Sequence, residues 1–112
     1  VFNLDNNLPI VNSNVRLISG WFDQTLKDFK IEKPIAYLHI DCDLYSSTKI
    51  IFDYLEPHIV PGTIIVFDEY FNYPGWKHGE FLAFKEFIQA KNLEYDYISY
   101  CRNHEQVAVI IK

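Results

Sequence analysis

The sequence predicts an α/β protein with a mainly parallel sheet that ends in an antiparallel hairpin. Two apolar strand segments, residues 35–40 and 63–67, each precede a segment with helical hydrophobic periodicity. Two further strand segments, 95–101 and 106–111, are separated by a short polar loop. Alternating strands and helices are typical of parallel sheets, and a short polar connection between two strands is typical of a hairpin.

The N-terminal part has weaker signals. Residues 1–14 are rich in Asn and lack hydrophobic periodicity, so we expect them to form a loop-like segment. Residues 15–19 predict a short strand, which Gly20 stops. Asp23 is expected to cap a short helix that follows this strand.

The central segments predict a strand, a helix and a second strand. The nearly continuous apolar run over residues 35–40 favours a strand covered on both faces, with His39 inside the sheet. Ser46 or Ser47 is expected to cap the following helix. After a turn marked by proline and glycine, residues 63–67 form the next strand.

The C-terminal segments predict a helix and the hairpin. Residues 80–91 have apolar side chains at helical spacing, so we expect an amphipathic helix with one buried face. The aromatic and β-branched residues of 95–101 and 106–111 favour strands. A length of 112 residues suits a single domain over residues 1–112.

Composition and charge exclude several classes of protein. The net charge of −5 leaves no basic surface for nucleic acid. No apolar run approaches the ~20 residues of a membrane span. The first residues lack the pattern of a signal peptide, and two cysteines do not make a disulfide framework. We therefore expect a cytoplasmic protein that binds neither nucleic acid nor membranes.

Carboxylates follow both central strands of the predicted sheet. Asp41 and Asp43 come after the first strand, and Asp68 and Glu69 come after the second. Ligands of open α/β sheets bind beyond the carboxyl ends of the strands, where these residues would converge. Oxygen ligands of this kind suit Mg²⁺, Ca²⁺ or Mn²⁺ better than zinc. The alternative is that they are solvated loop residues or helix caps.

The Asp-x-Asp pair at Asp41 and Asp43 is compatible with more than one enzyme class. A haloacid-dehalogenase-like phosphatase has such a pair, but requires Thr or Val where this sequence has Tyr45. A sugar-nucleotide transferase would use the pair to hold Mn²⁺ and a diphosphate. A lone Asp-x-Asp is a weak signal, so this second class stays open.

Three ordered blocks carry a more specific resemblance. They are Val15-Arg-Leu-Ile-Ser-Gly-Trp-Phe-Asp-Gln-Thr-Leu26, His39-Ile-Asp-Cys-Asp-Leu-Tyr-Ser-Ser-Thr48 and Val60-Pro-Gly-Thr-Ile-Ile-Val-Phe-Asp-Glu-Tyr70. With these blocks the sequence resembles the macrocin O-methyltransferase family (TylF-like), which belongs to the class I S-adenosylmethionine-dependent methyltransferases. The resemblance implies a Rossmann-like sheet and methyl transfer to a hydroxyl of a sugar or glycosylated small molecule.

The resemblance also implies roles for individual residues. Mg²⁺ or another divalent cation would be held by Asp41, Asp68 and Glu69, and it would bind the hydroxyls of the acceptor. Asp43 would be the general base. Contacts to S-adenosylmethionine would come from Ser19, Gly20, Trp21 and Asp41.

The sequence departs from the family in three places. Glu69 replaces an aspartate, and Thr63 replaces the second glycine of a Pro-Gly-Gly turn. No Gly-x-Gly turn for the cofactor is present. We therefore expect the sequence to begin near the third strand of the family's fold and to form a partial class I methyltransferase fold. Its exposed sheet edge could pair with another copy, and the alternative function is a non-catalytic half-domain that serves as an interaction module.

Overall fold

The computed structural model describes residues 8–112. The first half of the predicted N-terminal loop, residues 1–7, lies outside the described residues, and residues 8–14 form no helix or strand. The longer elements, in chain order, are α1 (Phe22–Asp28), β1 (Tyr37–Ile40), α2 (Tyr45–Leu55), β2 (Ile64–Phe67), α3 (Glu80–Lys91), β3 (Tyr95–Tyr100) and β4 (Val107–Ile111). Two 3₁₀ turns, η1 (Glu56–His58) and η2 (Trp76–His78), follow α2 and precede α3.

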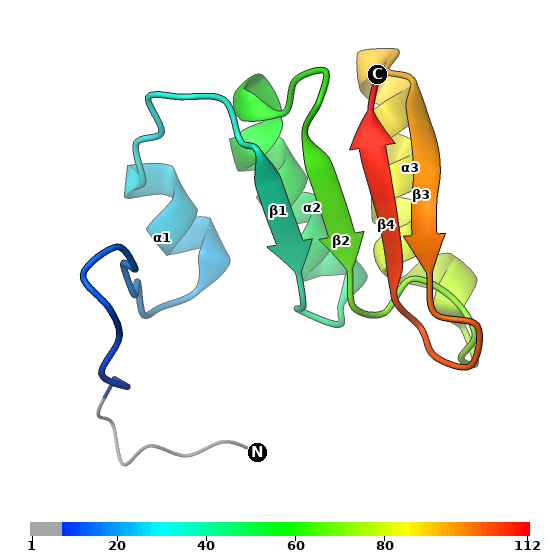
Figure 1. Ribbon diagram of the computed structural model, residues 1–112, viewed down its shortest axis with the longest axis horizontal. Coiled ribbons are helices and arrows are strands. Elements are labelled where there is room, and N and C mark those ends of the chain that lie inside the picture. The colour runs from blue at the N-terminus through cyan, green and yellow to red at the C-terminus, as the bar shows by residue number, and fades with distance from the viewer. Residues whose placement is uncertain (1–7) are drawn as a thin grey trace.

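The strands form one sheet in the order β1-β2-β4-β3 (Figure 1). β1 and β2 are parallel, whereas β4 is antiparallel to both β2 and β3. Three strands therefore point one way, and only β4 is reversed. The predicted α/β fold with a mainly parallel sheet and a terminal hairpin is confirmed.

The hydrophobic core lies between the sheet and the two helices α2 and α3, which lie on the same side of it (Figure 1). Alternation along β2 directs Ile65 and Phe67 toward these helices, and both are fully buried. The Phe52 ring of α2 stacks on Phe87 of α3 with 4.5 Å between ring centroids. Aromatic contacts of this kind contribute about 0.5–1.5 kcal/mol beyond the burial of area.

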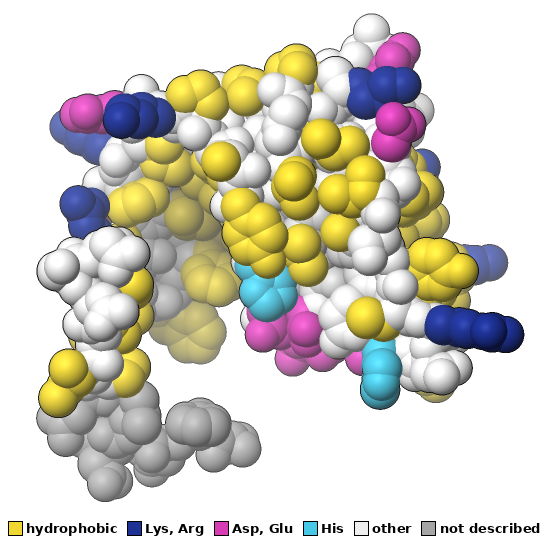
Figure 2. Space-filling model, in the orientation of Figure 1, with side chains coloured by type: hydrophobic (Ala, Val, Ile, Leu, Met, Phe, Trp, Pro, Cys, Tyr) yellow, Lys and Arg dark blue, Asp and Glu magenta, His cyan; other side chains and the backbone are white. Residues whose placement is uncertain are grey.

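The opposite face of the sheet is open, so the prediction that the first central strand is covered on both faces is wrong. Tyr37 of β1 is 60% exposed, and His39 is exposed as well. Because both helices after β1 and β2 lie on one side, nothing in residues 8–112 covers the other side. Figure 2 shows that this open face is largely hydrophobic, with acidic side chains gathered at its lower edge beside a histidine.

Two local predictions near the N-terminus are also wrong. Residues 15–19 are exposed and form no strand, because no neighbouring strand in residues 8–112 supplies the hydrogen bonds that a strand needs. Helix α1 begins after Trp21, so Asp23 lies in its first turn and does not cap it. Among residues 8–112, no helix has both the length and the apolar character to cross a membrane.

Helix α2 begins earlier than expected. Leu44 occupies the capping position, and Ser46 and Ser47 lie within the first turn. The chain turns sharply at Asp43, which has a φ of 64°. The buried hydroxyl of Thr48 then donates to the Leu44 carbonyl at 2.8 Å, so this threonine fixes the start of the helix.

Candidate functional site

The parallel pairing of β1 and β2 sets the position of the first two predicted carboxylates. The register places Ile40 beside Phe67, so the next residues of the two strands, Asp41 and Asp68, lie side by side. The backbone N–H of Asp68 donates to the Ile40 carbonyl at 2.9 Å, which extends the pairing past the strand ends. The expected convergence of the two strands at one edge is present for these two aspartates.

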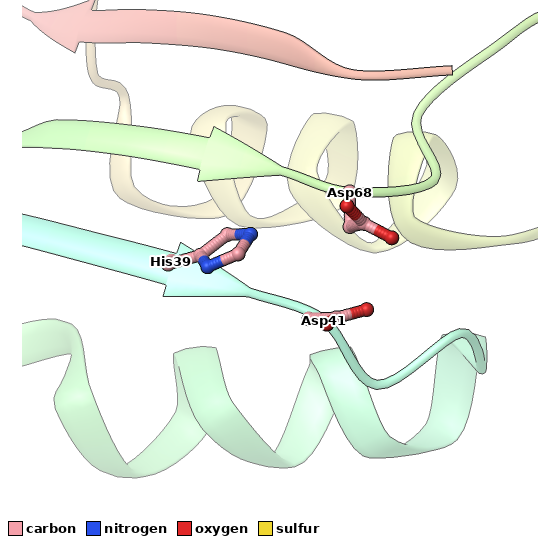
Figure 3. Close-up of side chains that lie close together, drawn as sticks. All are labelled: His39, Asp41 and Asp68. Carbon is pink, nitrogen blue, oxygen red and sulfur yellow. The ribbon is translucent and has the colours of Figure 1, made fainter. Parts of the chain in front are cut away.

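A histidine joins this pair. Possible ligand atoms of His39, Asp41 and Asp68 all lie within 4.8 Å of one another. Figure 3 shows the imidazole and the two carboxylates at the ends of β1 and β2. His39 was expected inside the sheet, and that expectation is wrong because its face of β1 is uncovered. The signal that could have found it is its spacing of two residues from Asp41, since such residues share one face of a strand.

The two aspartates lie close enough for their negative charges to repel each other. Desolvation raises the pKa of Asp41, and a hydrogen bond with Asp68 and the negative charge of Asp68 raise it further. The side-chain amide of Gln106 donates to Asp68 Oδ1 at 3.3 Å, so the residue just before β4 contributes a donor to the pair. A cation placed between the two carboxylates would relieve their repulsion.

The other two predicted residues, Asp43 and Glu69, form a separate pair. Glu69 follows Asp68 directly, in the bend that comes after β2. Desolvation raises the pKa of Glu69 to about 7, and a side-chain hydrogen bond with Asp43 and the charge of Asp43 contribute. The four carboxylates therefore form two pairs, and the cluster of ligand atoms contains Asp41 and Asp68 without Glu69.

A buried acid that sequence reasoning missed lies under the second pair. Glu80, the first residue of α3, has no exposed surface. Its Oε1 accepts the backbone N–H of Glu69 at 3.0 Å, whereas Oε2 has no hydrogen-bond partner among residues 8–112. Burial raises the pKa of Glu80 to about 7, although the backbone N–H groups of Glu69, Asp43 and Cys42 oppose the shift. An acid in the first turn of a helix is ordinarily exposed, so the sequence held no signal for its burial.

This burial predicts a dependence of stability on pH. The folded pKa of Glu80 is about 7, above its ordinary value of 4.5, so the folded state holds more protons than the unfolded state between these values. The stabilisation is complete below the unfolded pKa and is lost as the pH rises through about 7. We expect Glu80→Gln to remove this loss, which is on the order of 1–3 kcal/mol. Urea denaturation at about pH 5 and about pH 8, in the presence of a chelator, measures it.

The control for this experiment is Glu69→Gln, because Glu69 titrates in the same range but lies nearer to solvent. Glutamine at position 80 keeps an oxygen for the Glu69 N–H, so that the folded geometry is preserved. The prediction would be contradicted if the unfolding free energies of wild type and Glu80→Gln differed by the same amount at about pH 5 as at about pH 8.

Three of the four residues predicted to contact the cofactor lie just before α1, whereas the fourth, Asp41, lies in the acidic cluster. Ser19, Gly20 and Trp21 precede α1, and Trp21 is 78% exposed. Gly20 has a φ of 140°, and a Cβ there would lie 2.8 Å from the Thr25 methyl group. Gly20 and Trp21 line a groove of 580 Å³ together with Leu44, Ser46, Ser47 and Ile50 near the start of α2. Neither Ser19 nor Asp41 is among its lining residues.

The architecture is that of part of a class I methyltransferase. The structure of the O-methyltransferase NovP superposes with a TM-score of 0.73 at 28% sequence identity, over 89% of this chain and 38% of NovP. CalS11, a TDP-rhamnose 3'-O-methyltransferase of calicheamicin biosynthesis, shares the fold with a TM-score of 0.62 at 22% identity, over 83% of this chain and 39% of CalS11.

The model of the macrocin-O-methyltransferase (TylF) family matches residues 3–100, so the chain belongs to this family. A demethyldecarbamoylnovobiocin O-methyltransferase of Streptomyces niveus is 34% identical over 71 residues, which are 63% of this chain and 27% of that protein. A tetracenomycin-C rhamnosyl 4'-O-methyltransferase of Streptomyces olivaceus is 33% identical over 61 residues, 54% of this chain and 23% of that protein. The chain thus spans about a quarter of the length of these curated relatives.

Proposed function

We propose that the protein carrying this chain is an S-adenosylmethionine-dependent and divalent-metal-dependent O-methyltransferase. Its acceptor would be a hydroxyl of a sugar or of a glycosylated small molecule, because the names of the relatives describe such acceptors for those proteins. The observation that carries the proposal is the pair of aspartates, Asp41 and Asp68, at the ends of neighbouring parallel strands in a chain of this family. Family membership favours methyl transfer over the sugar-nucleotide and phosphatase alternatives.

The donor set fits a divalent cation. Asp41 and Asp68 offer carboxylate oxygens at the carboxyl edge of the sheet, and desolvation together with the negative charge of Asp68 raises the pKa of Asp41. Carboxylates are the ligands that Mg²⁺ and Mn²⁺ prefer. Glu69 was predicted as a third ligand, and it would have to leave Asp43 to serve as one. A bound cation would lower the pKa of an acceptor hydroxyl, as it does for water.

Asp43 is the candidate general base. Methyl transfer breaks the bond between the sulfonium sulfur and the methyl carbon, forms a bond from that carbon to the acceptor oxygen, and releases the hydroxyl proton. Asp43 lies at the turn between β1 and α2 and is exposed, so its carboxylate could take this proton once it is released from its hydrogen bond with Glu69. A positioned base of this kind contributes about 10²–10⁴ to the rate.

The groove beside Gly20 and Trp21 is the proposed contact with the cofactor. Trp21 offers an exposed aromatic surface suited to stacking on an adenine ring. Ser19 lies beside this segment in the chain and is proposed as a further contact. Because the sequence has no Gly-x-Gly turn, this chain supplies only part of the contacts that such a cofactor requires.

An apolar cavity lined mainly by aromatic side chains suits a glycosylated acceptor. It has a volume of 430 Å³, and its lining includes Tyr70, which follows Glu69 in the chain, and Val107, which follows Gln106. The remaining lining residues are Phe71, Trp76, Phe81, Tyr97, Ser99 and Tyr100. A cavity lined by aromatic side chains is typical of sites for apolar groups, so it would hold the non-sugar part of such an acceptor.

Thermal unfolding tests the proposal against the alternative of a non-catalytic half-domain. The chain is melted alone, with Mg²⁺, with S-adenosylmethionine and with both. A ligand at about 100 times its Kd stabilises the folded state by about 2.7 kcal/mol, which corresponds to roughly 10 °C for a domain of this size. S-adenosylhomocysteine and adenosine serve as matched controls for the cofactor.

The outcomes separate the two functions. A rise in Tm with S-adenosylmethionine supports an enzyme site that this chain can assemble. A rise with Mg²⁺ alone supports a metal half-site whose cofactor contacts come from other sequence. No rise with either ligand favours the half-domain that serves as an interaction module.

A further inference from the structure

We infer that His39 is the third protein ligand of the divalent cation, so that the site combines one imidazole nitrogen with the carboxylates of Asp41 and Asp68. This inference rests on the proposed metal dependence and goes beyond it, because it names a ligand and the class of ion that the ligand selects. The expected ion is a first-row transition ion such as Mn²⁺, in preference to Mg²⁺.

The backbone geometry places the three side chains on one face. His39 and Asp41 are two residues apart along β1, and Asp68 lies beside Asp41 through the parallel register. Side chains at alternate positions of a strand share a face, here the open face of the sheet. Their ligand atoms all lie within 4.8 Å of one another, which is close to the separation of about 4.0–4.4 Å between opposite ligands of an ion with metal–ligand distances of about 2.0–2.2 Å.

Glu69 is not part of this cluster. It lies in the bend that follows β2, and its backbone N–H donates to Glu80 at 3.0 Å. Its carboxyl group engages Asp43. His39 is exposed and has no side-chain hydrogen bond among the described residues that would have to break for it to bind an ion. Bringing His39 into the ligand set therefore needs only small side-chain rotations, whereas Glu69 would first have to leave Asp43.

An imidazole ligand changes which ion is preferred. Sites made of carboxylates, carbonyls and water suit Mg²⁺, Ca²⁺ and Mn²⁺, whereas imidazole suits transition ions. Mn²⁺ belongs to both groups, since it accepts oxygen and nitrogen ligands. We therefore expect Mn²⁺ to bind this chain more tightly than Mg²⁺, and we expect His39→Ala to reduce that difference.

The test is pulsed electron paramagnetic resonance of Mn²⁺ bound to the wild-type chain, which detects modulation from a directly coordinated ¹⁴N nucleus. We expect this modulation in the wild type and its loss in His39→Ala. The affinity of His39→Ala for Mn²⁺ should be at least about tenfold lower than that of the wild type, because residues that merely support metal ligands already contribute about 10–100-fold. The matched control is His58→Ala, because His58 lies after α2, next to the start of the β1 segment. Glu69→Gln is expected to keep the modulation.

The outcomes distinguish this inference from the proposed function. Tight Mn²⁺ binding that depends on Asp68 but shows no ¹⁴N modulation overturns the role of His39 and leaves the metal-dependent site in place. No Mn²⁺ or Mg²⁺ binding at all overturns the metal dependence and the inference together. The wild-type spectrum needs no variant, so the result does not depend on whether His39→Ala folds.

Discussion

Asp68→Ala is expected to lower the affinity of the chain for Mn²⁺ by at least about 100-fold, beyond the ~10–100-fold typical of residues that only support ligands. Asp68 is the member of the cluster that both lies beside Asp41 and accepts a hydrogen bond at 3.3 Å from the amide of Gln106, the residue just before β4. Its removal leaves Asp41 and His39 on a single strand, with nothing on β2 to close the site. Isothermal titration calorimetry with Mn²⁺ measures the loss.

The matched control for this prediction is Asp53→Ala. Asp53 is an exposed carboxylate on α2 that pairs with Lys49 at 2.9 Å, away from the cluster. Exposed pairs of this kind contribute only about 0–1 kcal/mol to stability, so this variant should fold and bind Mn²⁺ as the wild type does. Unchanged Mn²⁺ affinity in Asp68→Ala would remove the metal site from this edge of the sheet.

Asp43→Asn is expected to lower kcat by about 10²–10⁴ in the protein that carries this chain, while the affinity for Mn²⁺ stays within about twofold. Asparagine has nearly the same shape as aspartate but cannot accept the hydroxyl proton as a carboxylate does. Single-turnover methyl transfer from labelled S-adenosylmethionine to a sugar hydroxyl measures the chemical step.

A second measurement on the same variant does not depend on activity. Desolvation raises the pKa of Glu69, and Asp43 raises it further through its hydrogen bond and its charge. Removing that charge is therefore expected to lower the pKa of Glu69, which carbon NMR of the Glu69 carboxyl group would follow. Normal turnover together with a lowered Glu69 pKa would show that Asp43 is a structural neighbour of Glu69 and not the base.

The sequence was most informative where hydrophobic periodicity and turn residues agree. Helix α3 was predicted at residues 80–91 and is found at Glu80–Lys91, because its aromatic residues recur at helical spacing and Asn92 ends it in a left-handed conformation. The segment at residues 15–19 has the composition of a strand but no partner among residues 8–112. Strand formation depends on such a partner, which local sequence does not reveal.

The candidate site could be predicted in part. The convergence of Asp41 and Asp68 followed from the parallel arrangement of their strands, a property of the whole fold. The division of the four carboxylates into two pairs depends on which face each side chain occupies, and it separates Asp43 and Glu69 from the other two. The open face that exposes His39 could not be foreseen, because the apolar run of β1 looks like a strand covered on both sides.

The order of the strands also determines when the fold can close during synthesis. Of the strands in residues 8–112, β4 comes last in the chain but lies between β2 and β3. Until Val107–Ile111 leave the ribosome, β2 has one unpaired edge and β3 has no neighbour in this sheet. At roughly 5–20 residues per second, the nascent chain therefore exposes apolar strands that other proteins could capture. Gln106 reaches Asp68 only when β4 is inserted, so the acidic site is completed in the same step as the core.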